Sequence, residues 1–176
     1  DDGSSSSGSS DSGGGSGSSS GSSIVAGACA DGAAHMWDLR DASDDPVLSL
    51  RPADVAAPDV DAAVCVRVCN SAVFVSGHDG IVRVYDVRRH ECGAVLALDG
   101  HGRDTVFALD APTDATLYSG GADGRVNEWN VADGRLRSTV RAHAPSHSVL
   151  AMLTARGGRA YVTGGTDKRV RIMTFE

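Results

Sequence analysis

Two sets of residues along the chain carry the side chains of a nucleophilic triad, namely a histidine, a hydroxyl residue and an aspartate. They are His101, Ser119 and Asp123 in the first set, and His143, Thr163 and Asp167 in the second. Hydrolysis of this kind also needs an open pocket and an oxyanion site. The hydroxyl residues and the aspartates recur at the same spacing of 44 residues. A repeated fold requires such periodicity and catalysis does not, so we expect structural residues and no catalytic ones, with a hydrolase as an alternative.

The spacing of the histidines does not indicate a metal site. His35, His78 and His147 stand outside any His-x-x-x-His frame, and surface or strand positions account for them. No run of glycines has the spacing of a phosphate-binding loop. We therefore expect no metal and no cofactor.

The cysteines point to a reducing compartment. They are Cys29, Cys65, Cys69 and Cys92, and none of them forms a Cys-x-x-Cys pair. Cys65 and Cys69 would share one face of a strand, too far apart for a disulfide. Because free cysteines are commonly buried, we expect reduced thiols and an intracellular protein, cytoplasmic or nuclear.

The charge and hydropathy of the chain restrict its partners. Its 176 residues include 23 acidic and 16 basic ones, and the net charge is −7. An acidic chain repels phosphate backbones, which disfavours direct nucleic-acid binding. No stretch approaches the roughly 20 apolar residues of a membrane span, so we expect no membrane contact.

The first 23 residues differ from the rest. Residues 1–23 contain only Ser, Gly and Asp. A segment of this composition cannot bury enough apolar surface to offset its chain entropy. We expect a disordered linker there, with a phosphorylatable acidic-serine segment as the functional alternative.

From Ile24 onward the chain repeats itself. An aromatic residue or a methionine closes each unit, and the spacings between these residues are 48, 44 and 44 residues, for Trp37, Tyr85, Trp129 and Met173. Three units carry an Asp-Gly pair between two short apolar runs, at Asp31-Gly32, Asp79-Gly80 and Asp123-Gly124. A fixed period of this size is the signature of a repeat architecture.

The local pattern within each unit is that of β-strands. Val64, Val66 and Val68, for example, alternate along one face. An Asp-Gly pair favours a tight hairpin in which both central residues have positive φ. We expect strands at 24–28, 33–38 and 46–50, at 63–69, 72–76, 81–87 and 93–98, at 105–110, 116–119, 125–130 and 135–140, and at 148–154, 159–163 and 169–175.

These residues resemble the WD-repeat family. The family pattern is a Gly-His pair, an apolar strand, a small-residue strand, a turn Asp and a closing Trp-Asp pair, and the third unit supplies Gly100-His101, Ser119, Asp123 and Trp129-Asn130. The fourth unit supplies His143, Thr163 and Asp167 but closes on Met173-Thr174, and Lys168 follows its turn Asp in place of Gly. The resemblance implies that the His, Ser or Thr, Asp and Trp side chains hydrogen-bond within one blade.

The resemblance also implies an all-β fold, a β-propeller of four-stranded antiparallel blades. We expect a partial ring of about 3.5 blades, at about 24–52, 60–98, 101–141 and 143–176, with the inner strand of the first blade missing. Such a segment would leave two blade faces open to water. We therefore expect the remaining blades of the same propeller to cover these faces, with this chain as its C-terminal half.

The function implied by the resemblance is a scaffold that binds other proteins, as a subunit or adaptor of a multiprotein complex. Partners of the family dock on the face that carries the turn Asp residues and the loops before the inner strands. Here that face would hold Arg103, Asp104, His78, Pro145, Ser146, His147 and Lys168. A subunit of an RNA–protein assembly and a propeller hydrolase are the alternatives.

Overall fold

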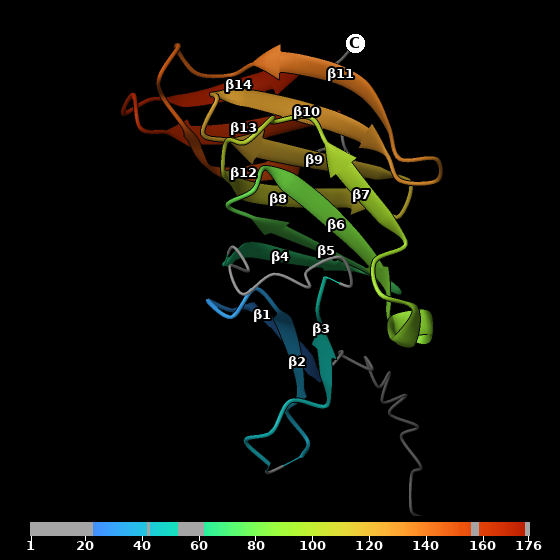
Figure 1. Ribbon diagram of the computed structural model, residues 1–176. Helices are drawn as coiled ribbons and strands as arrows, with labels where there is room; N and C mark the ends of the chain where they lie inside the picture. Colours follow the sequence, from blue (N-terminus) through green and yellow to red (C-terminus); the bar gives the residue numbers. More distant parts are fainter. Residues whose placement is uncertain (1–22, 42, 53–61, 156–158, 175–176) are drawn as a thin grey trace, which may run out of the picture.

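The computed structural model describes residues 23–41, 43–52, 62–155 and 159–174. This part of the chain folds into four antiparallel sheets, which confirms the expected all-β propeller architecture. Figure 1 shows the sheets stacked in sequence order, from the blue first sheet to the orange and red last one. The expected linker up to residue 22 and the loop at 53–61 lie outside the described residues.

The first and last sheets each contain three strands in the described part of the chain. The first sheet has the order β1-β2-β3, and its strands are β1 (Ile24–Ala28), β2 (Ala34–Asp38) and β3 (Leu48–Leu50). The last sheet has the order β12-β13-β14, with β12 (Val149–Ala155), β13 (Ala160–Gly165) and β14 (Val170–Thr174).

The two middle sheets contain four strands each. The second sheet consists of β4 (Ala63–Cys69), β5 (Ala72–Gly77), β6 (Ile81–Asp86) and β7 (Leu96–Asp99), with the short 3-10 helix η1 (Val87–Cys92) before its last strand. The third sheet consists of β8 (Val106–Thr113), β9 (Thr116–Gly121), β10 (Arg125–Asn130) and β11 (Arg135–Arg141). Strand β8 contacts β4 of the sheet before it and β12 of the sheet after it.

The Asp-Gly turns differ from the expected hairpin type. Gly32, Gly80 and Gly124 have positive φ, but the preceding aspartates do not. In the third sheet the Gly124 amide donates to the Gly121 carbonyl, so Ala122 and Asp123 are the two central residues. The prediction that Asp and Gly together form a two-residue turn was wrong, because the loop is longer and only the glycine after the turn needs the left-handed conformation.

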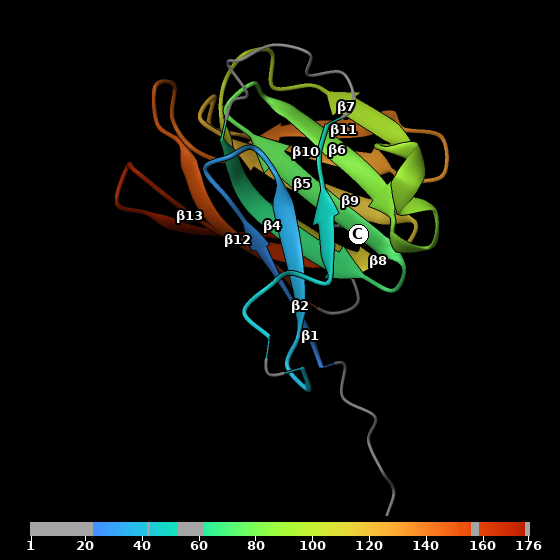
Figure 2. The ribbon, with the colours of Figure 1, turned by 60° about the horizontal axis from the view of Figure 1, so that its bottom comes forward.

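Apolar side chains fill the spaces between neighbouring sheets. Tyr85 packs between the first and second sheets, Trp129 between the second and third, and Tyr161 between the third and fourth. These three rings are each no more than 2% exposed. Figure 2 looks onto the first sheet with the second sheet behind it. Burial of large side chains between sheets therefore stabilises each sheet through its neighbours.

A buried carboxylate also joins three sheets. Asp110 on β8 is 2% exposed, and its Oδ1 lies 2.7 Å from the guanidinium of Arg67 on β4. Its Oδ2 accepts the Thr154 hydroxyl on β12 at 2.6 Å. Because β4, β8 and β12 belong to three successive sheets, these contacts of Asp110 hold the three sheets together.

One face of the last sheet is apolar and uncovered among the described residues. Val170 on β14 is 74% exposed, whereas the equivalent Val126 and Val82 of the third and second sheets are 2% and 0% exposed. Ile172 and Leu153 on the same face are 70% and 61% exposed. In the second and third sheets the next sheet in the row buries these positions. In the last sheet the same positions are exposed to solvent.

In the described residues, no helix is long and apolar enough to cross a membrane.

Candidate functional site

The third sheet holds a buried chain of hydrogen-bonded side chains. The ring of His101 lies in the loop before β8, with Nδ1 3.1 Å from Asp123 Oδ1 and Nε2 2.8 Å from Ser119 Oγ. Trp129 on β10 donates its indole N–H to the same Ser119 oxygen at 2.8 Å. The structure therefore brings together four side chains that are up to 28 residues apart in the sequence.

Glycine is required where this histidine packs on the sheet. A Cβ added at Gly121 would lie 2.5 Å from His101 Nδ1 and 2.9 Å from Asp123 Oδ1. A Cβ added at Gly100 would lie 2.6 Å from the ring of Trp129. All three distances are shorter than a packed Cβ atom allows, so the small residues beside the histidine are part of the same arrangement.

The fourth sheet repeats this arrangement with one partner fewer. His143 Nδ1 lies 2.8 Å from Asp167 Oδ1, and its Nε2 lies 3.0 Å from Thr163 Oγ1. Met173 stands where the third sheet has Trp129 and offers no N–H to the threonine. A Cβ at Gly165 would lie 2.5 Å from the His143 ring, so the glycine beside the histidine is required here too.

The Ser-His-Asp geometry does not present a nucleophile to solvent. Ser119 is 0% exposed and His101 is 4% exposed. The serine oxygen already contacts both the histidine ring and the indole N–H. A substrate carbonyl would have to reach this oxygen through the packed sheet, so the side chains act as internal hydrogen-bond partners.

The two turn aspartates are held in their ionised form. Burial raises the pKa of Asp123, but hydrogen bonds from His101 and from the Arg125 amide outweigh burial and bring the pKa below its usual value. The pKa of Asp167 is likewise lowered, because the contact with His143 and the Arg169 amide outweigh its burial. The charge of each aspartate therefore favours the folded state at neutral pH.

The turns of one sheet pack against the histidine loop of the next and form one continuous surface, which we call the loop face. It comprises the turns 77–81, 121–125 and 165–169 and the loops 100–105 and 142–148. A Cβ at Gly80 would lie 2.4 Å from the Gly102 carbonyl oxygen, and one at Gly124 would lie 2.5 Å from the His147 oxygen. The Gly124 carbonyl accepts the amides of Ala142 and His143, both at 3.0 Å.

The residues expected to contact partners lie on this loop face. His78, Arg103, Asp104, Pro145, Ser146 and Lys168 are exposed, and His147 is partly exposed. His78 Nδ1 lies 3.0 Å from Thr105 Oγ1, and His78 and Arg103 line one pocket together with Asp79 and Asp99. The structure thus gathers residues of three sheets on one side of the molecule, and their role in binding stays a prediction.

Comparison with known proteins decides the family. The family described as "WD domain, G-beta repeat" matches residues 91–130. The WD repeat-containing proteins RUP2 and RUP1 of Arabidopsis thaliana are 30% and 28% identical to the chain over 151 and 152 residues, 84% of the chain in each case. The chain belongs to the WD-repeat family. It spans only 40% and 37% of the length of these two relatives.

Solved structures with the same fold include two designed proteins. The computationally designed Ika4 protein is matched over 88% of this chain and 86% of its own, with 21% identity and a TM-score of 0.69. The designed Ika8 protein is matched over 87% of this chain and 43% of its own, with 21% identity and a TM-score of 0.68. At this identity the likeness concerns the fold alone, and the sheets are blades of a β-propeller.

The WD repeats of the first and second blades lack the complete network. Val75 in the second blade and Gly27 in the first occupy the position of Ser119, because they pair with the same position of the following strand. Ser76 lies one residue further along, and its hydroxyl donates to the Val106 carbonyl. The Trp37 indole instead donates to the Asp44 carbonyl at 3.2 Å. Ser76 is therefore not the structural equivalent of Ser119.

Sequence reasoning missed a residue that fastens the histidine loop to the third WD blade. Asn127 on β10 is 0% exposed, and its amide donates to the Gly100 carbonyl at 3.0 Å. The Thr139 hydroxyl donates to the amide oxygen of Asn127 at 2.8 Å. Asn127 lies two residues before Trp129 and therefore on the same face of the strand as this buried ring, which was the available signal.

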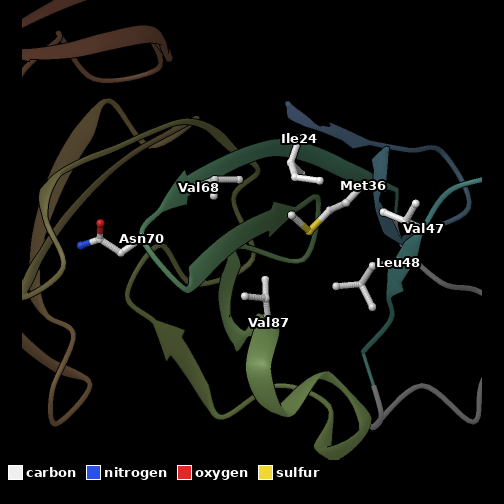
Figure 3. A pocket seen from close by; sticks show the side chains of 7 residues that line it. All are labelled: Ile24, Met36, Val47, Leu48, Val68, Asn70 and Val87. Atoms are coloured by element: carbon white, nitrogen blue, oxygen red, sulfur yellow. The ribbon is translucent and has the colours of Figure 1, made fainter. Parts of the chain in front are cut away.

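A second surface feature is an apolar groove between the first and second blades (Figure 3). Its lining residues are Ile24, Met36, Val47, Leu48, Val68, Asn70 and Val87. Val68 on β4 is 42% exposed, whereas the equivalent Ala111 on β8 is 8% exposed and packs between the second and third blades. The first blade has three strands in the described residues, and the groove lies beside Val68, which these strands leave exposed.

Proposed function

We propose that this chain is part of a WD-repeat scaffold that acts as a subunit or adaptor of a multiprotein complex. WD-repeat proteins are in general protein-interaction scaffolds. The observation that carries the proposal is the loop face, where turns and loops of successive blades are locked to one another. One related protein, from Xenopus laevis, is named a p21-activated protein kinase-interacting protein 1-like protein and is 30% identical over 112 residues.

The loop face has the properties of a recognition surface. Its backbone is fixed by close approaches at Gly80 and Gly124, so a partner would meet a surface that is already ordered. Its exposed side chains include Arg103 and Lys168, which suit carboxylates of a partner protein. Histidine and arginine side chains on a rigid rim supply both contact area and hydrogen bonds.

The open faces at the two ends of the row support the remaining blades as further partners. Val170 and Ile172 occupy positions that a following blade buries elsewhere in this chain. At the other end Trp37, the equivalent of the buried Trp129, is only partly buried. We therefore propose that further blades of the same propeller cover both faces, in keeping with relatives that extend well beyond the matched region.

The test is a charge reversal on the loop face of the intact protein. The double variant Arg103→Glu, Lys168→Glu should lose a partner protein that the wild type retains in affinity purification, with the loss then measured as binding of that purified partner. Arg135→Glu is the matched control, because Arg135 is exposed and begins β11 at the opposite end of the third blade. Equal binding by the double variant and the wild type would remove the loop face from the proposal.

A further inference from the structure

The turn of the first blade differs from the other three in a way that creates a different site. Cys29, Asp31 and His35 place one sulfur, one oxygen and one ring nitrogen within 4.8 Å of one another. All three come from the β1–β2 hairpin, the cysteine after β1, the aspartate in the turn and the histidine on β2. The spacing Cys-x-Asp-x-x-x-His differs from the His-x-x-x-His and Cys-x-x-Cys spacings of common metal sites.

Comparison with the other blades shows what has changed. The position of Cys29, two residues before the turn aspartate, is Gly77, Gly121 or Gly165 in the other blades. There a Cβ at Gly121 or Gly165 would lie 2.5 Å from the ring of a loop histidine. In the third and fourth blades the loop histidine leaves no room for a side chain at this position. In the first blade the side chain of Cys29 occupies it.

The residue four positions after the turn aspartate has changed as well. In the second and fourth blades it is Arg83 or Arg171, whose guanidinium lies 2.7 or 3.7 Å from the turn aspartate. An arginine cannot ligate a metal, but the histidine at position 35 can. Two of the three potential ligands are therefore residue types that no other blade of this chain has at these positions.

The imidazole of His35 is oriented for coordination. Its Nε2 lies 3.2 Å from Asp31 Oδ2, and its Nδ1 lies 2.8 Å from Ser49 Oγ on the neighbouring strand. When Nδ1 carries the proton and donates it to Ser49, the lone pair of Nε2 is free to coordinate a metal on the side of Asp31 Oδ2. Histidines that bind metals commonly donate their second ring nitrogen to such a partner.

From this geometry we propose that Cys29, Asp31 and His35 form a site for a divalent transition metal, with Zn²⁺ as the ion that fits best. Thiolate, imidazole and carboxylate are all ligands of zinc, and three protein ligands leave the fourth tetrahedral position to water. Ligand atoms of a tetrahedral zinc ion are about 3.5 Å apart, so the three groups need to move together only slightly.

Arg51 is the competitor for this site. Its Nη2 lies 2.7 Å from Asp31 Oδ2, the same oxygen that contacts His35. Both Arg51 and Asp31 are largely exposed, so the pair is screened and can separate. A metal at the site would share the carboxylate with this guanidinium or displace it, and removing Arg51 should make binding tighter.

The experiment is a titration of the full chain with Co²⁺, followed by Zn²⁺ displacement measured with a chromophoric chelator. The wild type should bind one Co²⁺ with a thiolate-to-cobalt charge-transfer band. Cys29→Gly, which restores the residue of the other blades, should abolish the band. Ser49→Ala should weaken Zn²⁺ binding about 10- to 100-fold. Arg51→Ala should strengthen it.

The matched control is Cys65→Ser, which removes another partly buried thiol on the neighbouring blade. Thermal unfolding of every variant without metal shows whether it remains folded. Absence of a charge-transfer band in the wild type would overturn the proposal. So would a band that persists in Cys29→Gly, or one that Cys65→Ser removes as completely. Because none of these readouts depends on a partner protein, the outcome is independent of the proposed scaffold role.

Discussion

Ser119 is the meeting point of the buried polar side chains in the third blade. Its hydroxyl lies between the His101 ring and the Trp129 indole, each 2.8 Å away. Thr163 holds the same position in the fourth blade, where its hydroxyl lies 3.0 Å from the His143 ring and Met173 stands in place of the tryptophan. The two blades can therefore be compared directly. Two buried groups hydrogen-bond to the hydroxyl oxygen in the third blade, and, in the described part of the chain, one does so in the fourth.

We predict that Ser119→Ala lowers the free energy of unfolding by about 3 kcal/mol, because it leaves two buried donor or acceptor groups without a partner. Thr163→Val, which removes the corresponding hydroxyl and keeps the shape, should cost about half as much, or ~1.5 kcal/mol. Urea unfolding followed by tryptophan fluorescence measures both. Equal losses in the two variants would contradict the assignment of two partners to Ser119.

The turn aspartates predict an acid-dependent stability. The pKa of Asp123 is lowered in the folded chain, so its contribution is complete above its unfolded pKa of about 3.9. That contribution is lost as the pH falls through the lower folded pKa. Asp123→Asn should therefore show a shallower decrease in unfolding free energy than the wild type below about pH 4. Asp133→Asn, in the exposed turn before β11, is the control for the loss of a carboxylate that contacts no buried histidine.

At the scale of elements, the turns after the second strand of each blade show how loops and sheets are joined. Gly124 combines a φ of +74° with a close approach to the next histidine loop. Lys168 adopts a similar φ of +61° in the last blade, where the described residues include no following loop. Of the residues that follow the turn aspartates of the last three blades, Lys168 thus has a side chain, and the described residues leave room for it there.

We predict opposite effects of substitutions at these two turns. Lys168→Gly should raise the free energy of unfolding by up to about 1 kcal/mol, because it relieves the left-handed conformation of a residue with a Cβ. Gly124→Ala should lower it by more than about 2 kcal/mol, because left-handed strain and the clash with the His147 carbonyl add together. Thermal and urea unfolding compare the two, and destabilisation by Lys168→Gly would refute the strain argument.

The strands were largely predictable because their alternation and turn residues are local features. Strands β4, β5, β6 and β10 were placed to within one residue of their observed bounds. The turn type was not predictable, because Asp-Gly occurs in both short and long hairpins. Asn127 and Asp110 also escaped prediction, since their roles depend on the Gly100 carbonyl and on strands from other blades. Likewise, only the fold brings Cys29 near His35.

At the scale of the whole molecule, the chain is a row of blades with unlike ends. The last blade exposes Leu153, Val170 and Ile172 on one face. The first blade presents Trp37 together with the Cys29, Asp31 and His35 cluster. Within the row, the equivalent faces are closed by the neighbouring blade. The central claim is therefore that each blade is stabilised by packing against a neighbouring blade. The exposed apolar face of the last blade is then a surface that a further blade would bury.

Sedimentation velocity of the 176-residue chain over a range of concentrations tests this claim most directly. The exposed apolar face predicts association that grows with concentration and that Val170→Lys together with Ile172→Lys suppresses. Leu39→Lys, which changes an exposed apolar residue outside the blade face, should leave association unchanged. A wild-type chain that stays monomeric and folded at every concentration would contradict the claim that this face is an interface.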